Sequence, residues 1–144
     1  MIGQDEPALT VVVDVANVMG ARADGWWRDR VGAALRLSQQ VIALAERGVP
    51  AGLMPGGLPD PEEWVLVLEG RARGAAADAV KTADDAGARV RVVTAPGSGD
   101  DEIVAEVVSL DGGCLVVTAD RELRRRCAAA GATVTGPGWL LRLL

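Results

Sequence analysis

Five short runs of apolar residues recur along the chain, and longer segments with apolar residues at helical spacing separate them. Runs of this length, apolar on both faces and rich in valine, are typical of strands buried in a parallel sheet. The predicted strands are Leu9–Asp14, Trp64–Glu69, Arg89–Thr94, Cys114–Thr118 and Ala132–Thr135. In the third of them, polar and apolar residues alternate, so we expect this strand at an edge of the sheet.

The segments between these runs predict helices that end at glycine. The predicted helices cover residues 26–47, 72–86, 100–110 and 120–130. Residues 15–25 are predicted as a loop, residues 50–63 as a proline-rich surface connection and residues 139–144 as a terminal turn. Because strands and helices alternate throughout, the sequence predicts an α/β domain with a mostly parallel sheet. We expect residues 1–8 to form a leader and residues 9–144 a single domain.

Composition narrows the class of protein. The 144 residues are 49% apolar, enough to fill the core of one domain, and no run approaches the ~20 apolar residues of a membrane span. With two cysteines and no histidine, the chain lacks the usual ligands of a structural zinc site. We therefore expect a cytoplasmic protein that does not bind membranes. The net charge of −5 argues against a general nucleic-acid coat but not against a nuclease whose acids hold cations.

Acidic residues follow several of the predicted strands. Asp14 ends the first strand, Glu69 ends the second, and Asp120 follows the fourth, while Asp100 and Asp101 open the helix after the third. Parallel strands joined by right-handed crossovers send their carboxyl ends to one edge of the sheet, where ligands bind in such folds. The sequence therefore predicts five carboxylates at one edge.

Carboxylates this close repel one another unless cations compensate them. Ligands that are all oxygen suit Mg²⁺ or Mn²⁺ better than zinc or copper. Ions of this kind activate water and stabilise the leaving oxygen in phosphodiester hydrolysis. We therefore interpret the five acids as a predicted magnesium or manganese site.

Three motifs carry a resemblance to a known family. The segments VVVDVANV, GSGDDEIV and VVTADRELRRR resemble the acidic motifs of PIN-like nucleases, in particular the bacterial single-domain NYN (YacP-like) proteins. The resemblance extends from about residue 9 to residue 135. It implies a three-layer α/β/α sandwich with a parallel five-stranded sheet in the order 3-2-1-4-5, and metal-dependent ribonuclease activity that leaves a 5′-phosphate.

The resemblance also implies roles for individual residues. Asp14 matches the central metal ligand, Asp100 the acid in the middle of the chain and Asp120 the acid after the fourth strand, so these three are the expected catalytic residues. Asn17 and Thr118 are expected to contact or position the substrate. Glu69 departs from the pattern, since an aspartate is expected there.

The main alternative interpretation of these acids is that they cap the ends of helices and do not bind a metal. The run from Ser98 to Asp101 fits a capping box in which Asp101 reaches back to Ser98, and Asp120 is well placed to cap the next helix. Asn17 can hold a turn through its side chain. Asp14 has the fewest alternatives, because the predicted loop at 15–25 leaves it no helix to cap.

Other residues have both a functional and a structural reading. Arg121, Arg124 and Arg125, followed by Arg126, start beside the acids and are candidates for binding the phosphates of a substrate, although arginines on a helix are often only solvated. Trp26 and Trp27 are candidates for stacking on bases or for packing at the start of a helix. Gly97-Ser98-Gly99 lacks the features of a nucleotide-binding loop.

The sequence thus predicts a divalent-metal-dependent endoribonuclease acting on single-stranded or structured RNA. The alternative is a PIN-like module that binds RNA or a protein without cutting it. A receiver or phosphotransfer domain shares the sheet, but it needs a lysine after the last strand, where this chain has GPGWLLRLL. Whether the chain pairs with a second copy of itself or with another protein stays open.

Overall fold

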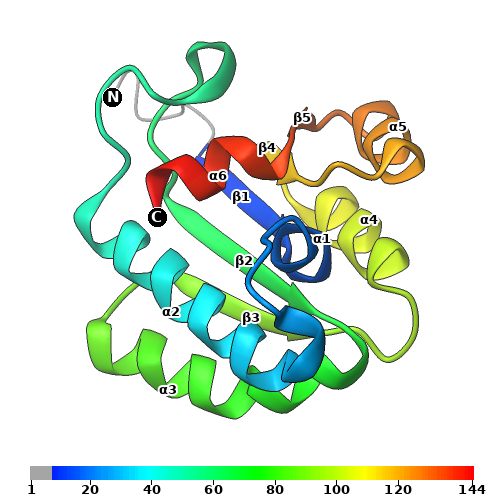
Figure 1. The fold of residues 1–144 in the computed structure, drawn as a ribbon. Helices are drawn as coiled ribbons and strands as arrows, with labels where there is room; N and C mark the ends of the chain where they lie inside the picture. Colours follow the sequence, from blue (N-terminus) through cyan, green and yellow to red (C-terminus); the bar gives the residue numbers. More distant parts are fainter. Residues whose placement is uncertain (1–7) are drawn as a thin grey trace.

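A sheet of five parallel strands forms the middle layer of the molecule (Figure 1). The computed structural model describes residues 8–144, so the predicted leader, except Ala8, lies outside the described residues. The strands are β1 (Leu9–Asp14), β2 (Glu63–Leu68), β3 (Val90–Thr94), β4 (Gly113–Val117) and β5 (Thr133–Thr135). All neighbours pair in parallel, in the order β3-β2-β1-β4-β5. The predicted fold class, the strand order and the edge position of β3 are confirmed.

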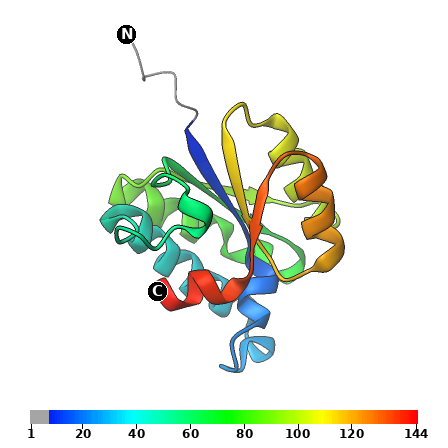
Figure 2. The same ribbon diagram turned by 90° about the horizontal axis from the view of Figure 1, so that it is seen from above.

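Helices cover both faces of this sheet. The α-helices are α1 (Val15–Gly20), α2 (Arg30–Arg47), α3 (Ala76–Ala86), α4 (Gly99–Ser109), α5 (Arg121–Ala129) and α6 (Pro137–Leu143), and the 3₁₀-helices are η1 (Trp26–Arg28), η2 (Pro55–Gly57) and η3 (Gly70–Ala75). One face carries α1, α2 and α6, and the other carries α4 and α5 (Figure 2). Within residues 8–144, no helix combines the length and apolar character needed to cross a lipid bilayer.

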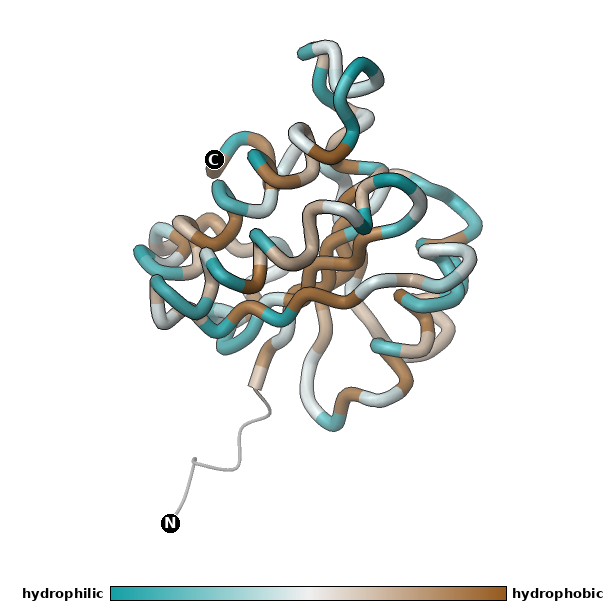
Figure 3. The backbone as a smooth tube through the Cα atoms, turned by 90° about the horizontal axis from the view of Figure 1, so that it is seen from below, coloured by the Kyte–Doolittle hydropathy of each residue, from teal (hydrophilic) through white to brown (hydrophobic). Residues whose placement is uncertain are grey.

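The central strand β1 divides the core into two parts. All six of its residues are buried. Val11 and Val13 pack toward α1, α2 and α6, whereas Val12 packs toward α4 and α5. Figure 3 shows the apolar strands in the interior and polar segments around them. Burial of each of these valine side chains stabilises the folded state by roughly 1.5–3 kcal/mol. Strand β1 is therefore held firmly in the core, and the residues that follow it have a fixed position.

Helix α1 replaces part of the predicted loop at residues 15–25. The carboxylate of Asp14 accepts a hydrogen bond from the backbone N–H of Asn17 at 3.3 Å and so caps this helix. Val15, Val18 and Met19 are buried at helical spacing and hold it against the sheet. The expectation that Asp14 has no helix to cap is therefore wrong, because six residues suffice for a helix that is capped and buried on one side.

Three further segments differ from the prediction in kind, and most other boundaries differ by one residue. The segment 26–47 is divided into η1 and α2, because Asp29 begins a new helix by accepting a hydrogen bond from the N–H of Gly32 at 2.9 Å. The segment 72–86 is divided into η3 and α3. The terminal turn is the helix α6, which begins at Pro137, where the missing N–H of proline costs nothing.

Candidate active site

Several predicted site residues lie at the carboxyl edge of the sheet. Asp14 is the last residue of β1, Glu69 directly follows β2, and Thr118 directly follows β4. Asp100 lies in the first turn of α4, and Asp120 is the N-terminal cap of α5. Figure 1 shows α1 at the end of β1, next to the segments that enter α4 and α5.

Asp14 is a buried carboxylate held by two parts of the chain. Its side chain is 5% exposed. One carboxylate oxygen accepts the bond from the N–H of Asn17, and the other accepts a hydrogen bond from the Thr118 hydroxyl at 2.9 Å. Two neutral donors fix the orientation of the group, but they bring no positive charge to it.

The environment of Asp14 disfavours its charged form. Burial is the main cause that raises the pKa of its carboxyl from 3.8 to about 6; the charges of Glu69 and Asp100 act in the same direction, and the two hydrogen bonds act against it. Burial also raises the pKa of Asp100, where Asp120 and Glu69 add repulsion and Arg126 opposes it. These couplings place Asp14, Glu69, Asp100 and Asp120 near one another. We call these four residues the acidic cluster.

Two members of the acidic cluster also stabilise helix starts. A carboxylate oxygen of Asp120 accepts a hydrogen bond from the N–H of Leu123 at 2.9 Å, so Asp120 caps α5 as its alternative reading predicted. Glu69 accepts a hydrogen bond from the N–H of Gly99, the first residue of α4, at 2.9 Å. The longer side chain of glutamate thus spans the gap between the end of β2 and α4.

Asp101 is an exposed acid whose charge makes the smallest of the contributions to the pKa of Asp100. Its carboxylate is 75% exposed and pairs with the guanidinium of Arg126 at 3.0 Å. The predicted capping box is wrong in detail, because the Ser98 hydroxyl accepts from the N–H of Asp100 and no bond runs from the Asp101 side chain back to Ser98. Asp101 is therefore a peripheral acid that pairs with α5.

Within residues 8–144, no three acidic or cysteine side chains are arranged as a ready-made metal cage. The five predicted ligands therefore do not surround a single point. The hydrogen bonds described above hold several of these carboxylates in other directions; the five are Asp14, Glu69, Asp100, Asp101 and Asp120. The donors still fit a magnesium-sized ion, because Mg²⁺ keeps several waters and is commonly bound through one or two carboxylates. Burial and the neighbouring acids raise the pKa of Asp14, so a cation bound there would stabilise its charged form. Metal binding stays a prediction.

Thr118 and Asn17 connect the ends of β1 and β4. The Thr118 side chain is fully buried, and its hydroxyl donates to Asp14 while it accepts from the N–H of Asp120 at 3.2 Å. The Asn17 side-chain oxygen accepts from the N–H of Ala119 at 2.8 Å. This geometry favours positioning roles for both residues over direct contact with a substrate.

Only part of the arginine run on α5 is unpaired. Arg125 forms an ion pair with Glu122, and Arg126 pairs with Asp101. In the part of the chain that the structure describes, Arg121 and Arg124 form no ion pair. These two residues are therefore the better candidates for contact with a phosphate.

A second group of cations was not predicted as part of the site. A pocket of about 300 Å³ is lined by Trp26, Arg30, Glu69 and Arg71, so it shares Glu69 with the acidic cluster. In the sequence, Arg30 and Arg71 are far apart and belong to different helices, and no motif marks them. Arg71 is two positions after Glu69 in the sequence, whereas the closeness of Arg30 to both follows from the packing of η3 beside α2.

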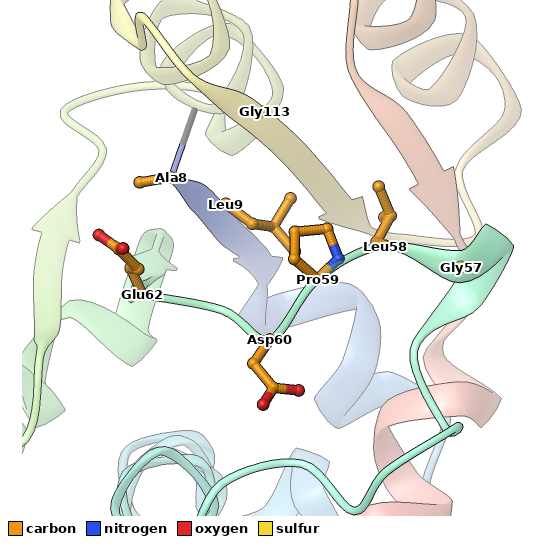
Figure 4. Close-up of a pocket in the computed structure, with 8 residues that line it drawn as sticks. All are labelled: Ala8, Leu9, Gly57, Leu58, Pro59, Asp60, Glu62 and Gly113. Atoms are coloured by element: carbon orange, nitrogen blue, oxygen red, sulfur yellow. The ribbon is translucent and has the colours of Figure 1, made fainter. Parts of the chain in front are cut away.

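Another cavity, of about 500 Å³, lies at the opposite edge of the sheet (Figure 4). Leu9 and Gly113, at the amino ends of β1 and β4, line it together with Leu58 and Pro59 of the proline-rich connection. Its two acids, Asp60 and Glu62, are exposed and belong to that connection. This cavity is therefore separate from the acidic cluster.

Comparison with known proteins supports the fold. The structure is similar to the crystal structure of a point mutant of Rae1 (YacP) from Bacillus subtilis, with a TM-score of 0.61 and 16% sequence identity over 92% of this chain and 72% of that chain. No family model matches the chain, and no curated protein matches its sequence. At this identity the likeness concerns the fold alone. The chain therefore has a YacP-like α/β fold.

Proposed function

We propose that this protein is a divalent-metal-dependent endoribonuclease whose active site is the acidic cluster. The observation that carries the proposal is the buried carboxylate of Asp14, whose pKa is raised to about 6 among three further acids. Such a group costs stability, and groups of this kind concentrate at functional sites. It lies at the sheet edge where α/β folds bind their ligands.

The residues divide into those that hold a cation and those that support them. Asp14 and Asp100 would hold Mg²⁺ or Mn²⁺, with Asp120 and Glu69 at its periphery. A cation bound there supplies an activated water and stabilises charge on the phosphate oxygens. Thr118 and Asn17 fix the ends of β1 and β4, so Asp14 keeps its orientation without rearrangement. Arg121 and Arg124 contact the phosphates on either side of the bond that is cut.

Two observations support the proposal that RNA is the substrate. The three acidic motifs resemble those of NYN and PIN-like nucleases, and the fold is like that of Rae1 (YacP). In this structure, Asp14 ends β1, Glu69 directly follows β2, and Asp120 caps α5 after β4. We therefore propose RNA over other phosphodiesters.

Cleavage of a labelled single-stranded RNA tests the proposal. The wild-type protein should cut it in Mg²⁺ or Mn²⁺ and not in EDTA. Asp14→Asn should lower the rate at least ~100-fold, as loss of a principal electrostatic contact does. The matched control is Asp85→Asn, which removes an exposed carboxylate from α3 that pairs only with Lys81. Equal rates for wild type and Asp14→Asn would refute the assignment.

A second candidate is a binding module that does not cut RNA. It is favoured by the lack of three ligand-like side chains around one point in residues 8–144. Thermal unfolding with increasing Mn²⁺ distinguishes the two, because a site that binds the ion stabilises the fold by RT ln(1 + [L]/Kd). A melting temperature that rises with Mn²⁺ in the wild type, but not in Asp14→Asn, supports the nuclease.

A further inference from the structure

A pocket of about 300 Å³ opens beside the acidic cluster, between α1, the start of α2 and η3. Trp26, Arg30, Glu69 and Arg71 line it together with small and apolar residues of α1 and η3. The volume lies at the lower limit of the range of roughly 300–1,000 Å³ typical of ligand pockets, so it suits one small planar group.

The two arginines are available for a ligand. Arg30 lies over the Trp26 ring, with its guanidinium carbon 5.4 Å from the ring centroid, and Arg71 is exposed. Within the described residues, neither forms an ion pair, although Glu69 lines the same pocket. Unpaired guanidinium groups beside an indole present flat surfaces for a base and donors for a phosphate.

The position of Glu69 connects the pocket to the site of cleavage. Glu69 is a member of the acidic cluster, since its charge raises the pKa of Asp14, and it is also part of the pocket wall. A strand whose phosphate lies at the acidic cluster therefore brings an adjacent nucleotide to the pocket. A base can enter it only when it is unpaired, because paired bases are stacked within a helix.

We propose that this pocket binds one unpaired nucleotide of the RNA, with its base against Trp26 and Arg30 and a flanking phosphate at Arg71. The proposal rests on the proposed function and adds to it a preference for single-stranded RNA. The pocket holds the strand beside the bond to be cut, and Arg121 and Arg124 contact it from α5.

Binding is measured by fluorescence anisotropy of a labelled single-stranded RNA, with every variant made in the Asp14→Asn background so that no RNA is cut. Trp26→Leu should weaken binding about 5- to 150-fold, the effect of removing one base-stacking side chain. Replacing one nucleotide at a time by an abasic unit should weaken binding most at one position. At that position, the losses of affinity caused by the abasic unit and by Trp26→Leu should not be additive, because both changes remove the same contact.

Matched controls separate the pocket from general effects. Trp27→Leu changes the neighbouring indole, which is 55% exposed and does not line the pocket, and should leave binding nearly unchanged. Arg71→Gln, at an exposed residue that tolerates substitution, should weaken binding, whereas Arg36→Gln on the exposed side of α2 should not. Trp26→Phe keeps an aromatic ring and should restore most of the affinity if Trp26→Leu unfolds the protein.

The outcomes distinguish this proposal from the proposed function. Binding that depends on Trp26 and Arg71, in a protein that never cuts RNA, supports the pocket and refutes the nuclease. Cleavage by the protein with Asp14 intact, together with unchanged binding in Trp26→Leu and Arg71→Gln, refutes the pocket and leaves the nuclease intact. Equal affinity for double-stranded and single-stranded RNA, or additive effects of the abasic unit and Trp26→Leu, also refutes the pocket.

Discussion

Asp14→Asn should make the protein more stable while it lowers the rate of the proposed cleavage at least ~100-fold. Asp14 is 5% exposed, and its pKa is raised from 3.8 to about 6. At about 1.4 kcal/mol for each tenfold change in proton affinity, the ionised carboxylate costs the folded state about 3 kcal/mol at pH 8. An asparagine has no such cost. After a loss of about 1 kcal/mol for less favourable hydrogen bonds, the variant should be about 2 kcal/mol more stable.

The sign of the pH dependence follows from the direction of the pKa shift. The folded state keeps the Asp14 proton up to about pH 6, whereas the unfolded state loses it near pH 3.8. Between these values the folded state binds more protons, so its stability falls as the pH rises, and the loss is complete above the folded pKa. The stability advantage of Asp14→Asn should therefore grow by about 2 kcal/mol between pH 4.5 and pH 8.

Urea unfolding followed by tryptophan fluorescence measures this difference, because Trp64 and Trp139 are buried. A chelator in the buffer keeps cations out of the acidic cluster. Asp85→Asn, at an exposed residue of α3, is the control and should differ from wild type by the same small amount at each pH. A variant that is less stable than wild type at pH 8, or an advantage that does not grow with pH, would refute the interpretation of Asp14.

Three further predictions concern the supports of the site and the thiols. Thr118→Val removes the hydroxyl that donates to Asp14, so the free energy of unfolding at pH 8 should fall by about 1.5–3 kcal/mol and the pKa of Asp14 should rise further. The control is Thr118→Ser, which keeps the hydroxyl and should behave as wild type in the same urea series. Gly99→Ala would place a methyl group 2.8 Å from the Glu69 carboxylate and break its hydrogen bond to α4. It should lower stability by about 1 kcal/mol in the urea assay, and Gly97→Ala, where the added group meets open space, should not. Burial raises the pKa of the Cys114 thiol to about 12 and also raises the pKa of Cys127. Both thiols should therefore react with a thiol reagent only as fast as the protein unfolds, and a fast reaction in the native state would contradict this.

Much of the fold is predictable from the chain because each strand is a separate apolar run. Leu9–Asp14 reads as a buried strand, and the structure gives it the same bounds. The alternation in the third run also places β3 correctly at an edge. Helix α1 was missed because six residues are too few for a helical repeat, although Asp14 and the spacing of Val15, Val18 and Met19 carry its signal.

The candidate site is predictable in outline and not in its contacts. The topology of a parallel sheet brings the ends of β1, β2 and β4 to one edge, so the closeness of Asp14 and Asp120 follows from strand positions alone. The bond between Glu69 and Gly99 joins residues 30 positions apart and depends on the length of one side chain. The pattern of apolar residues along the chain does not predict a contact of this kind. It also does not predict that Arg30 and Arg71 line the same pocket, because this depends on how η3 packs beside α2.

The hydrogen bond between Thr118 and Asp14 spans 104 positions of the chain. During synthesis, the segment with Asp14 leaves the ribosome well before its partner has been made, since translation adds about 5–20 residues per second. An incomplete chain therefore lacks the donor that orients this carboxylate. If the protein cuts RNA, a nascent chain that has not yet been made as far as residue 118 cannot hold Asp14 in the orientation that it has in the complete fold.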